Sequence, residues 1–128
     1  MTSFLKTLVL GASIALAGGA AHADNAPVRL IIGFPPGGAL DNLARSLAEE
    51  LRGSLKEPVL VENRPGASTR ISIEAVKTAR PDGRTILIGG TPPFVLFPMT
   101  YARLNYDVDK DFIPVAHLAN VPSVVSTG

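Results

Sequence analysis

Three short apolar segments alternate with two segments of helical periodicity, and this alternation limits the possible folds more than any other feature. The apolar segments, rich in β-branched residues, are 28–34, 59–63 and 85–88. The segments between them, 40–55 and 71–79, repeat their apolar residues every three or four positions. Connections of this length allow the strands to run parallel. The order strand, helix, strand, helix, strand therefore predicts a parallel α/β sheet.

The first helix is the clearest of these predictions. We expect one of its faces to pack against the sheet, formed by Leu40, Leu43, Ala44, Leu47, Ala48, Leu51 and Leu55. We expect its polar face to lie in solvent, with Asp41, Asn42, Arg45, Glu49, Glu50 and Arg52. The second helix is less regular, and its predicted core residues are Ile71, Ala75, Val76 and Ala79.

The pattern is weaker after the third strand. Residues 113–118 and 121–125 are apolar enough to predict two further strands, divided by Asn120. His117 is the only histidine after residue 23 and falls inside the first of them. We therefore expect it to be a structural histidine within a strand rather than a catalytic base.

The first 23 residues predict a cleavable signal peptide. Lys6 supplies a positive charge, residues 8–16 are apolar, and Ala21-His22-Ala23 provides small residues for signal peptidase. The apolar run is shorter than the roughly 20 residues that cross a bilayer. We expect cleavage after Ala23, which exports a mature chain of residues 24–128 as one small domain.

The charge balance and the lack of cysteine exclude several classes of partner. Only Lys6 of the 12 Lys and Arg residues lies in the signal, which leaves 11 against 11 Asp and Glu. A neutral chain gives no reason to expect nucleic acid, because phosphate binding requires an excess of Lys and Arg. Without cysteine there can be no disulfide and no thiolate metal site.

Ligands of open parallel sheets bind at the carboxyl ends of the strands, where the loops converge. Here those loops are 34–39, 64–70 and 89–93. In the first, Gly37 and Gly38 allow close approach of the backbone, and the helix that follows presents unpaired amide groups. These amides predict a site for an anion, and a carboxylate suits it. The alternative is that Pro-Pro-Gly-Gly is only a turn.

Other kinds of site lack essential residues. The glycine spacings of dinucleotide-binding and phosphate-binding loops do not follow the first strand. Asp107, Asp109 and Asp111 resemble the start of a calcium loop, but its sixth and twelfth positions are Phe112 and Leu118. No set of acid, base and nucleophile is evident. We therefore expect no cofactor, no metal and no enzymatic activity.

Four motifs follow one another along the chain. They are Phe34-Pro35-Pro36-Gly37-Gly38-x-x-Asp41, Val61-Glu62-Asn63-Arg64-Pro65-Gly66-Ala67, Pro81-Asp82-Gly83-x-Thr85 and Tyr106-Asp107-x-x-Lys110-Asp111-Phe112-x-Pro114-Val115. In this order they resemble the receptor proteins of tripartite tricarboxylate transporters, the Bug family. The resemblance implies a periplasmic-binding-protein fold, type II-like, whose two α/β lobes close on a ligand and deliver it to a membrane permease. At this length, the chain would hold an incomplete amino-terminal lobe and lack the second.

The resemblance also implies where a ligand lies. In such receptors a small organic carboxylate is held in the cleft mainly by backbone amides and bridging waters. Carried over to this chain, the expected ligand contacts are Phe34, Pro36, Gly37, Gly38, Ala39, Asp41, Ala67, Ser68, Gly90 and Thr91.

The chain departs from the family pattern in the second loop and in length. Relatives usually have Gly-Gly-Asn-Ile-Gly where this chain has Ser68-Thr69-Arg70-Ile71-Ser72, so Arg70 is expected either to contact the ligand or to plug the site. Pro92 and Pro93 stand where relatives tend to have serine and glycine. The length leaves an alternative open, a truncated or degenerate gene product without autonomous ligand binding.

Overall fold

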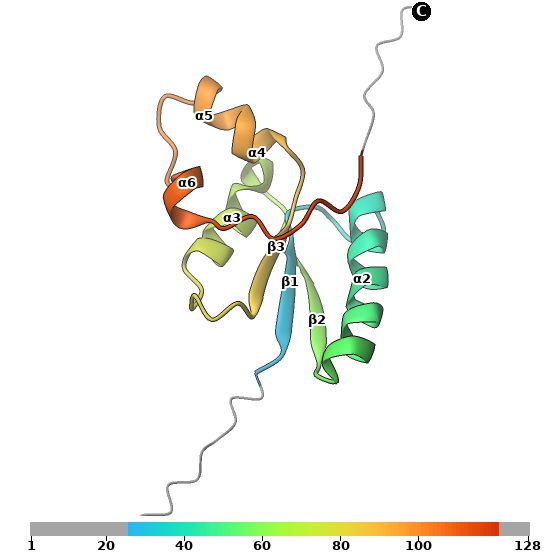
Figure 1. Cartoon of the computed structure of the whole chain (residues 1–128). Helices are drawn as coiled ribbons and strands as arrows, with labels where there is room; N and C mark the ends of the chain where they lie inside the picture. The colour runs from blue at the N-terminus through green and yellow to red at the C-terminus, as the bar shows by residue number, and fades with distance from the viewer. Residues whose placement is uncertain (1–25, 121–128) are drawn as a thin grey trace, which may run out of the picture.

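The computed structural model describes residues 26–120. Its centre is a sheet of three parallel strands in the order β2-β1-β3, with β1 at Val28–Ile32, β2 at Val59–Asn63 and β3 at Thr85–Ile88 (Figure 1). The predicted parallel α/β sheet is confirmed. Ile32 pairs with both Asn63 and Ile88, so the three strands end level with one another. Their carboxyl ends therefore form one edge, from which the loops emerge.

Two helices cover the sheet. Helix α2 (Ala39–Leu55) packs against β1 and β2, and α3 (Arg70–Lys77) packs against β1 and β3 on the other side (Figure 1). The main core lies between α2 and the sheet, where Val28, Leu30, Ile32, Ala44, Ala48, Val59 and Ile88 are buried together. Leu40, Leu47 and Leu51 pack against this cluster.

Two residues of α2 differ from the prediction. Leu55 remains 48% exposed, because it is the last residue of the helix and is followed at once by the left-handed Lys56 that ends it. Asp41, expected in solvent, is only 2% exposed. Its carboxylate is held by Arg45 one turn along the helix, by the Gly37 amide and by Asn63 at the end of β2, and the helical period alone could not reveal the last of these.

The predicted core face of α3 holds in part, because Ala75, Val76 and Ala79 are half-buried, but the buried side of the helix is rotated away from Ile71. Ser72 and Ile73 are buried, whereas Ile71 is 50% exposed. Two close approaches set this rotation. A Cβ atom on Gly33 would lie 2.6 Å from Ser72 Oγ, and one on Gly66 would lie 2.6 Å from Ile71 Cδ1. These glycines bring Ser72 against the end of β1 and leave Ile71 over the turn before the helix.

The chain after β3 forms short helices and no further strand within the described residues. They are α4 (Pro92–Val95), α5 (Phe97–Thr100) and α6 (Val108–Asp111). The strand predicted at 113–118 is wrong: Ile113 and Val115 are 89% and 80% exposed and pair with no other strand. His117 is likewise exposed and not part of a strand. The strand predicted at 121–125 lies outside the described residues.

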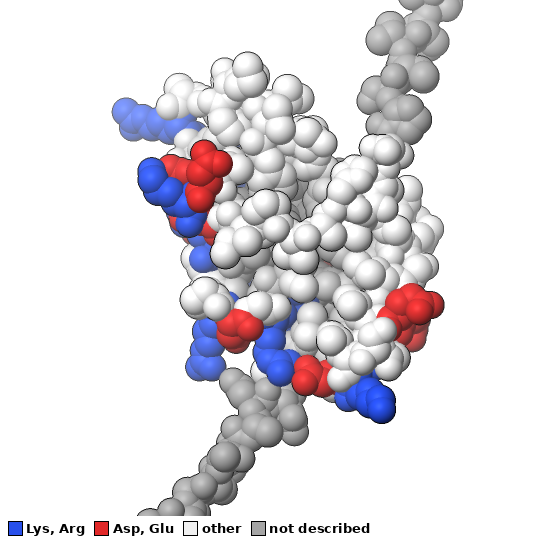
Figure 2. Space-filling model, viewed as in Figure 1, with Lys and Arg blue, Asp and Glu red and all other residues white. Residues whose placement is uncertain are grey.

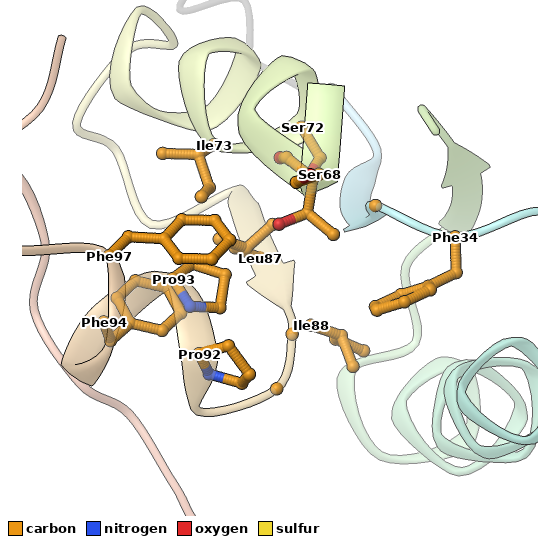
Figure 3. A pocket seen from close by; sticks show the side chains of 14 residues that line it. Phe34, Ser68, Ser72, Ile73, Leu87, Ile88, Pro92, Pro93, Phe94 and Phe97 are labelled. Carbon is orange, nitrogen blue, oxygen red and sulfur yellow. The ribbon is translucent and has the colours of Figure 1, made fainter. Parts of the chain in front are cut away.

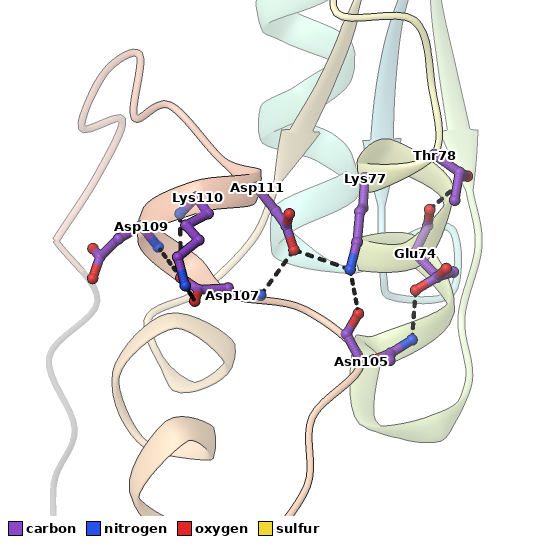
Figure 4. Close-up of polar contacts among 8 residues, drawn as sticks. All are labelled: Glu74, Lys77, Thr78, Asn105, Asp107, Asp109, Lys110 and Asp111. Carbon is purple, nitrogen blue, oxygen red and sulfur yellow. Dashed lines mark hydrogen bonds and ion pairs between the residues drawn. The ribbon is translucent and has the colours of Figure 1, made fainter.

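Helix α6 is capped and tied to α3. The side chain of Asp107 accepts the backbone amides of Asp109 and Lys110 at 3.1 and 3.2 Å. The ammonium of Lys77 in α3 lies 3.0 Å from Asp111 and donates to the carbonyl oxygen of Asn105 at 2.5 Å (Figure 4). Two of the acids that resembled a calcium loop therefore serve as a helix cap and an ion pair.

Two further residues of this sequence motif, Tyr106 and Phe112, pack against α4. The hydroxyl of Tyr106 is buried and donates to the carbonyl oxygen of Pro93 at 2.5 Å. Phe112 packs edge-on against Phe94, with ring centroids 5.8 Å apart, and against Tyr106 at 6.0 Å. Tyr106 and Phe112 thus fix α4 at the carboxyl edge of the sheet.

Candidate functional site

A pocket of about 210 Å³ opens at the carboxyl edge of the sheet. Its walls come from the residues after β1 and β3, the start of α3, and the helices α4 and α5. No Lys, Arg, Asp, Glu or His lines it. In Figure 2 the charged side chains lie mainly along the lower edge and the left side of the molecule, and the centre of this face is uncharged.

Aromatic and proline side chains form two facing sides of this pocket. Phe94, Phe97 and Pro93 lie on one side and Phe34 on the other (Figure 3). Phe97 is held in turn by Tyr101, with ring centroids 5.0 Å apart. Phe34 is 44% exposed. A ligand between these sides would therefore cover an aromatic ring that is otherwise open to water.

The polar groups of the pocket are hydroxyls and backbone. Ser68, Thr69 and Ser72 come from the turn before α3 and its first residues. The hydroxyl of Ser72 donates to the carbonyl oxygen of Thr69 at 2.6 Å. Thr69 Oγ1 is buried and has no hydrogen-bond partner within the described chain. Gly89 and Gly90 add backbone without side chains.

The turn that carries Ser68 and Thr69 has an unusual backbone. Ala67, Ser68 and Thr69 have φ angles of +48°, +55° and +70°, the left-handed region that costs a non-glycine residue about 1–2 kcal/mol. The sequence had indicated that this chain lacks the glycines of its family here. The backbone keeps a conformation that glycine adopts freely, with three residues that do not.

The loop after β1 leads to the start of α2. Gly38 is the N-cap of the helix, and no side chain caps it. The first amides of the helix, at Ala39 and Leu40, have no acceptor within the helix because the ladder of hydrogen bonds begins at Asn42, which donates to Gly38. The amide of Gly37, in contrast, is already used, since it donates to Asp41 at 2.9 Å.

Asp41 holds this loop in place. Its carboxylate accepts two hydrogen bonds from Arg45, at 2.9 and 3.1 Å, and one from the side-chain amide of Asn63 at 2.8 Å. The same amide of Asn63 donates to the carbonyl oxygen of Phe34 at 3.1 Å. The end of β2 is thus connected both to the loop and to α2. Two of the four sequence motifs, those containing Asp41 and Asn63, meet in this network.

The network also fixes the charge of Asp41. Hydrogen bonds from Arg45, from the Gly37 amide and from Asn63 hold the pKa of the Asp41 carboxyl far below its usual range. Asp41 is therefore an anion at any physiological pH. Its two oxygens are occupied by groups of this chain, and its negative charge opposes a carboxylate in the same loop.

The structure brings together only some of the residues expected to contact a ligand. Phe34, Ser68 and Gly90 line the pocket. Ala67 lines a separate groove. The remaining residues lie outside both, in the loop and helix start after β1 or beside α4: Pro36, Gly37, Gly38, Ala39, Asp41 and Thr91.

Several pocket residues lie outside the expected ligand contacts and loops, among them residues of α3, of the end of β3 and of α4 and α5. Gly33 and Ser72 were assigned to a strand and a weak helix, although a glycine at the end of an apolar strand indicates a close approach. Phe94 and Phe97 fall in a segment without a clear period, and no sequence signal placed them. Arg70 neither contacts nor plugs the pocket, because it points into the other groove. No group of three metal-binding side chains occurs among residues 26–120.

Comparison with known proteins identifies the family. Residues 43–127 match the model of the tripartite tricarboxylate transporter family receptor. The protein BugT of Bordetella pertussis is 39% identical over 125 residues, which cover 93% of this chain and 38% of BugT. A UPF0065 protein of Bordetella bronchiseptica is 37% identical over 102 residues, 80% of this chain and 30% of the relative.

Solved structures agree with this. MatC from Rhodopseudomonas palustris, solved with bound malate, is 34% identical with a TM-score of 0.67, over 72% of this chain and 31% of MatC. A periplasmic transporter is 35% identical with a TM-score of 0.65, over 70% of this chain and 30% of that protein. The chain spans about a third of the length of the relatives that it matches. Since the family model covers most of the chain and the fold agrees, the chain belongs to the receptor family of the tripartite tricarboxylate transporters.

Proposed function

We propose that this chain forms one wall of a binding site for a small organic carboxylate and acts as a periplasmic receptor that delivers it to a tripartite tricarboxylate-type permease. It binds the ligand and releases it unchanged. The signal peptide predicted at residues 1–23 supplies the route to the periplasm. No helix among the described residues is long and apolar enough to cross a membrane.

The observation that carries the proposal is the uncharged pocket at the carboxyl edge of the sheet. Phe34 belongs both to this pocket and to the loop that ends at the uncapped start of α2. A ligand over this edge meets apolar side chains, hydroxyls and free amides. In the related MatC the bound molecule is malate, a small carboxylate of the kind such a surface suits.

The amides favour an anion over a neutral ligand. A helix start contributes about 0.3–1 kcal/mol toward a nearby negative charge, more when the site is partly buried. That is too little for tight binding by one helix, so several amides and hydroxyls must act together. Without a lysine or arginine in the pocket, the site recognises carboxylate oxygens by directed hydrogen bonds, which distinguish the geometry of one acid from another.

Calorimetric titration tests this proposal. The purified protein is titrated with malate, citrate, other dicarboxylates, aromatic acids and acidic amino acids. Choline is the cationic control, glucose is the uncharged control, and MatC is the reference protein. We expect heat of binding from at least one acid and none from the controls, with the acid recovered unchanged. If no acid gives heat of binding with this chain while malate does so with MatC, the chain does not bind carboxylates.

A further inference from the structure

A second concave surface lies on the other side of the turn formed by residues 67–69. This groove, about 710 Å³, runs between α3 and the segment after α5 and shares no residue with the pocket. Arg64, Arg70 and Arg103 line it, and Glu74 is its only acidic residue. Three guanidinium groups beside one carboxylate give the groove an excess of positive charge, in a chain that is otherwise nearly neutral.

The two carboxylates near the groove are already engaged. Glu74 accepts the side-chain amide of Asn105 at 2.5 Å, across the floor between α3 and the later segment (Figure 4). Glu62 is shared by two arginines: it accepts both hydrogen bonds of the Arg29 guanidinium, at 2.5 and 2.9 Å, and lies 3.1 Å from Arg64. Neither acid forms an ion pair with Arg70 or Arg103.

Two contacts within the chain hold the side chain of Arg70 in the groove. Its Nε donates to the carbonyl oxygen of Ala67 at 2.9 Å, and its guanidinium lies 5.2 Å from the ring centroid of Tyr101. This contact fixes the plane of the guanidinium and leaves both Nη atoms without a partner within residues 26–120. Arg103 makes no hydrogen bond or ion pair with this part of the chain. Two guanidinium groups therefore border one groove, and the Nη donors of both have no partner within residues 26–120.

We propose that the groove binds a small dianion through Arg70 and Arg103, with Arg64 adding to the positive field. A planar guanidinium matches the paired oxygens of a carboxylate or a phosphate, and two of them match a doubly charged ligand. The shared chemistry fits a dicarboxylate or inorganic phosphate. The site is separate from the pocket, so it does not depend on what the pocket binds.

NMR of the arginine side chains in the purified full chain tests this. The Nε–Hε signals are followed during titration with inorganic phosphate, with malate, and with acetate as a monoanion at equal ionic strength. We expect the Arg70 and Arg103 signals to shift together and to saturate with a dianion. Acetate should bind at least about tenfold more weakly. The dianion that binds more tightly, phosphate or malate, shows which of the two chemical classes the groove selects.

Two variants and a matched control separate this site from general charge effects. Arg103→Ala and Arg70→Met should each weaken dianion binding by about tenfold, since each removes one charge-assisted partner. Lys56→Asn removes the same charge at a left-handed position that asparagine tolerates, and it should leave binding unchanged. Arg103 is exposed and makes no hydrogen bond or ion pair within residues 26–120, so we expect Arg103→Ala to preserve the fold. Equal affinities in Arg103→Ala and Lys56→Asn, or no saturating shift with either dianion, would overturn the proposal.

Discussion

Single residues carry the strain and the charge of the site. One turn concentrates unfavourable features: Ala67, Ser68 and Thr69 have left-handed angles, and the Thr69 hydroxyl has no hydrogen-bond partner within residues 26–120. Asp41 is the opposite case, a buried carboxylate with every oxygen used. Ser68 and Thr69 of this turn line the pocket, and Asp41 holds the loop after β1, so both shape the backbone around the proposed site.

Glycine at position 68 should stabilise the protein. Ser68 is exposed with φ +55° and ψ +50°, so Ser68→Gly removes a conformational cost of about 1–2 kcal/mol and adds about 0.5–1 kcal/mol of unfolded-chain entropy. We expect a net gain of about 0.5–1 kcal/mol in chemical denaturation. The matched control is Ser46→Gly, exposed in the middle of α2, which should destabilise by about 0.5 kcal/mol. A loss of stability in Ser68→Gly would show that the turn is not strained.

Asp41→Asn should change how stability depends on pH. The folded-state pKa of Asp41 lies below its ordinary value of 3.8. Its contribution is therefore fully present above that value and is lost as the pH falls through the folded-state pKa. We expect Asp41→Asn to lower the denaturation midpoint at pH 7, and the difference from the wild type to shrink progressively below pH 3.8. A constant difference from pH 7 down to acid unfolding would contradict the ion-pair network.

The elements show why some of the fold could be predicted from the sequence and some could not. The strands and α2 follow from local periodicity, and they formed where that periodicity lies. The rotation of α3 depends on two close approaches, of Gly33 to Ser72 far along the sequence and of Gly66 to the nearby Ile71, and neither shows in the helical period. The segment 113–118 has strand composition, but a strand needs a partner, and the described chain offers it none. In each of these cases the packing of the rest of the chain, or the lack of a partner strand, decided the outcome.

Gly33→Ala should disturb the junction of β1 and α3. Its new Cβ would lie 2.6 Å from Ser72 Oγ and 2.7 Å from Thr69 Cβ, closer than atoms can pack. We expect a loss of about 1–3 kcal/mol in unfolding free energy.

Gly53→Ala provides the matched control for this substitution. Gly53 lies in α2 with nothing within 4 Å of a new Cβ, so alanine there should add about 0.5–1 kcal/mol. Opposite signs for the two alanines are the expected result. An unchanged unfolding free energy in Gly33→Ala would show that the junction of β1 and α3 can shift to accept the new Cβ.

Tyr106→Phe should loosen the support behind α4. It removes the hydroxyl that donates to Pro93 while keeping the ring against Phe112, so we expect a loss of about 1–2 kcal/mol by thermal or chemical denaturation. Tyr101→Phe is the control, because the Tyr101 hydroxyl makes no hydrogen bond in the described chain and its loss should stay within about 0.5 kcal/mol. Equal losses of stability in the two variants would show that the hydrogen bond from Tyr106 to Pro93 does not stabilise the protein.

Taken as a whole, the molecule is a small parallel sheet, and much of its sequence shapes the edge where the strands have their carboxyl ends. Asn63 and Asp41 hold the first loop, Tyr106 and Phe112 hold α4, and Gly33 closes the junction with α3. Three of the four family motifs contribute to this support. The residues of these three motifs are therefore explained by the contacts that they make at this edge.

Replacing Ala39 tests the role of the α2 start most directly. Ala39 is the first helical residue, and Gly38 before it has φ −81° and ψ +173°, which a following proline accepts. Ala39→Pro therefore removes one amide hydrogen and leaves the helix intact, whereas Ala39→Ser keeps that hydrogen and changes only the side chain. Calorimetry with the acid that binds the wild type should show at least about fivefold weaker binding for Ala39→Pro and unchanged binding for Ala39→Ser. Equal affinity of both variants, with equal melting temperatures, would show that the α2 amides do not hold the carboxylate.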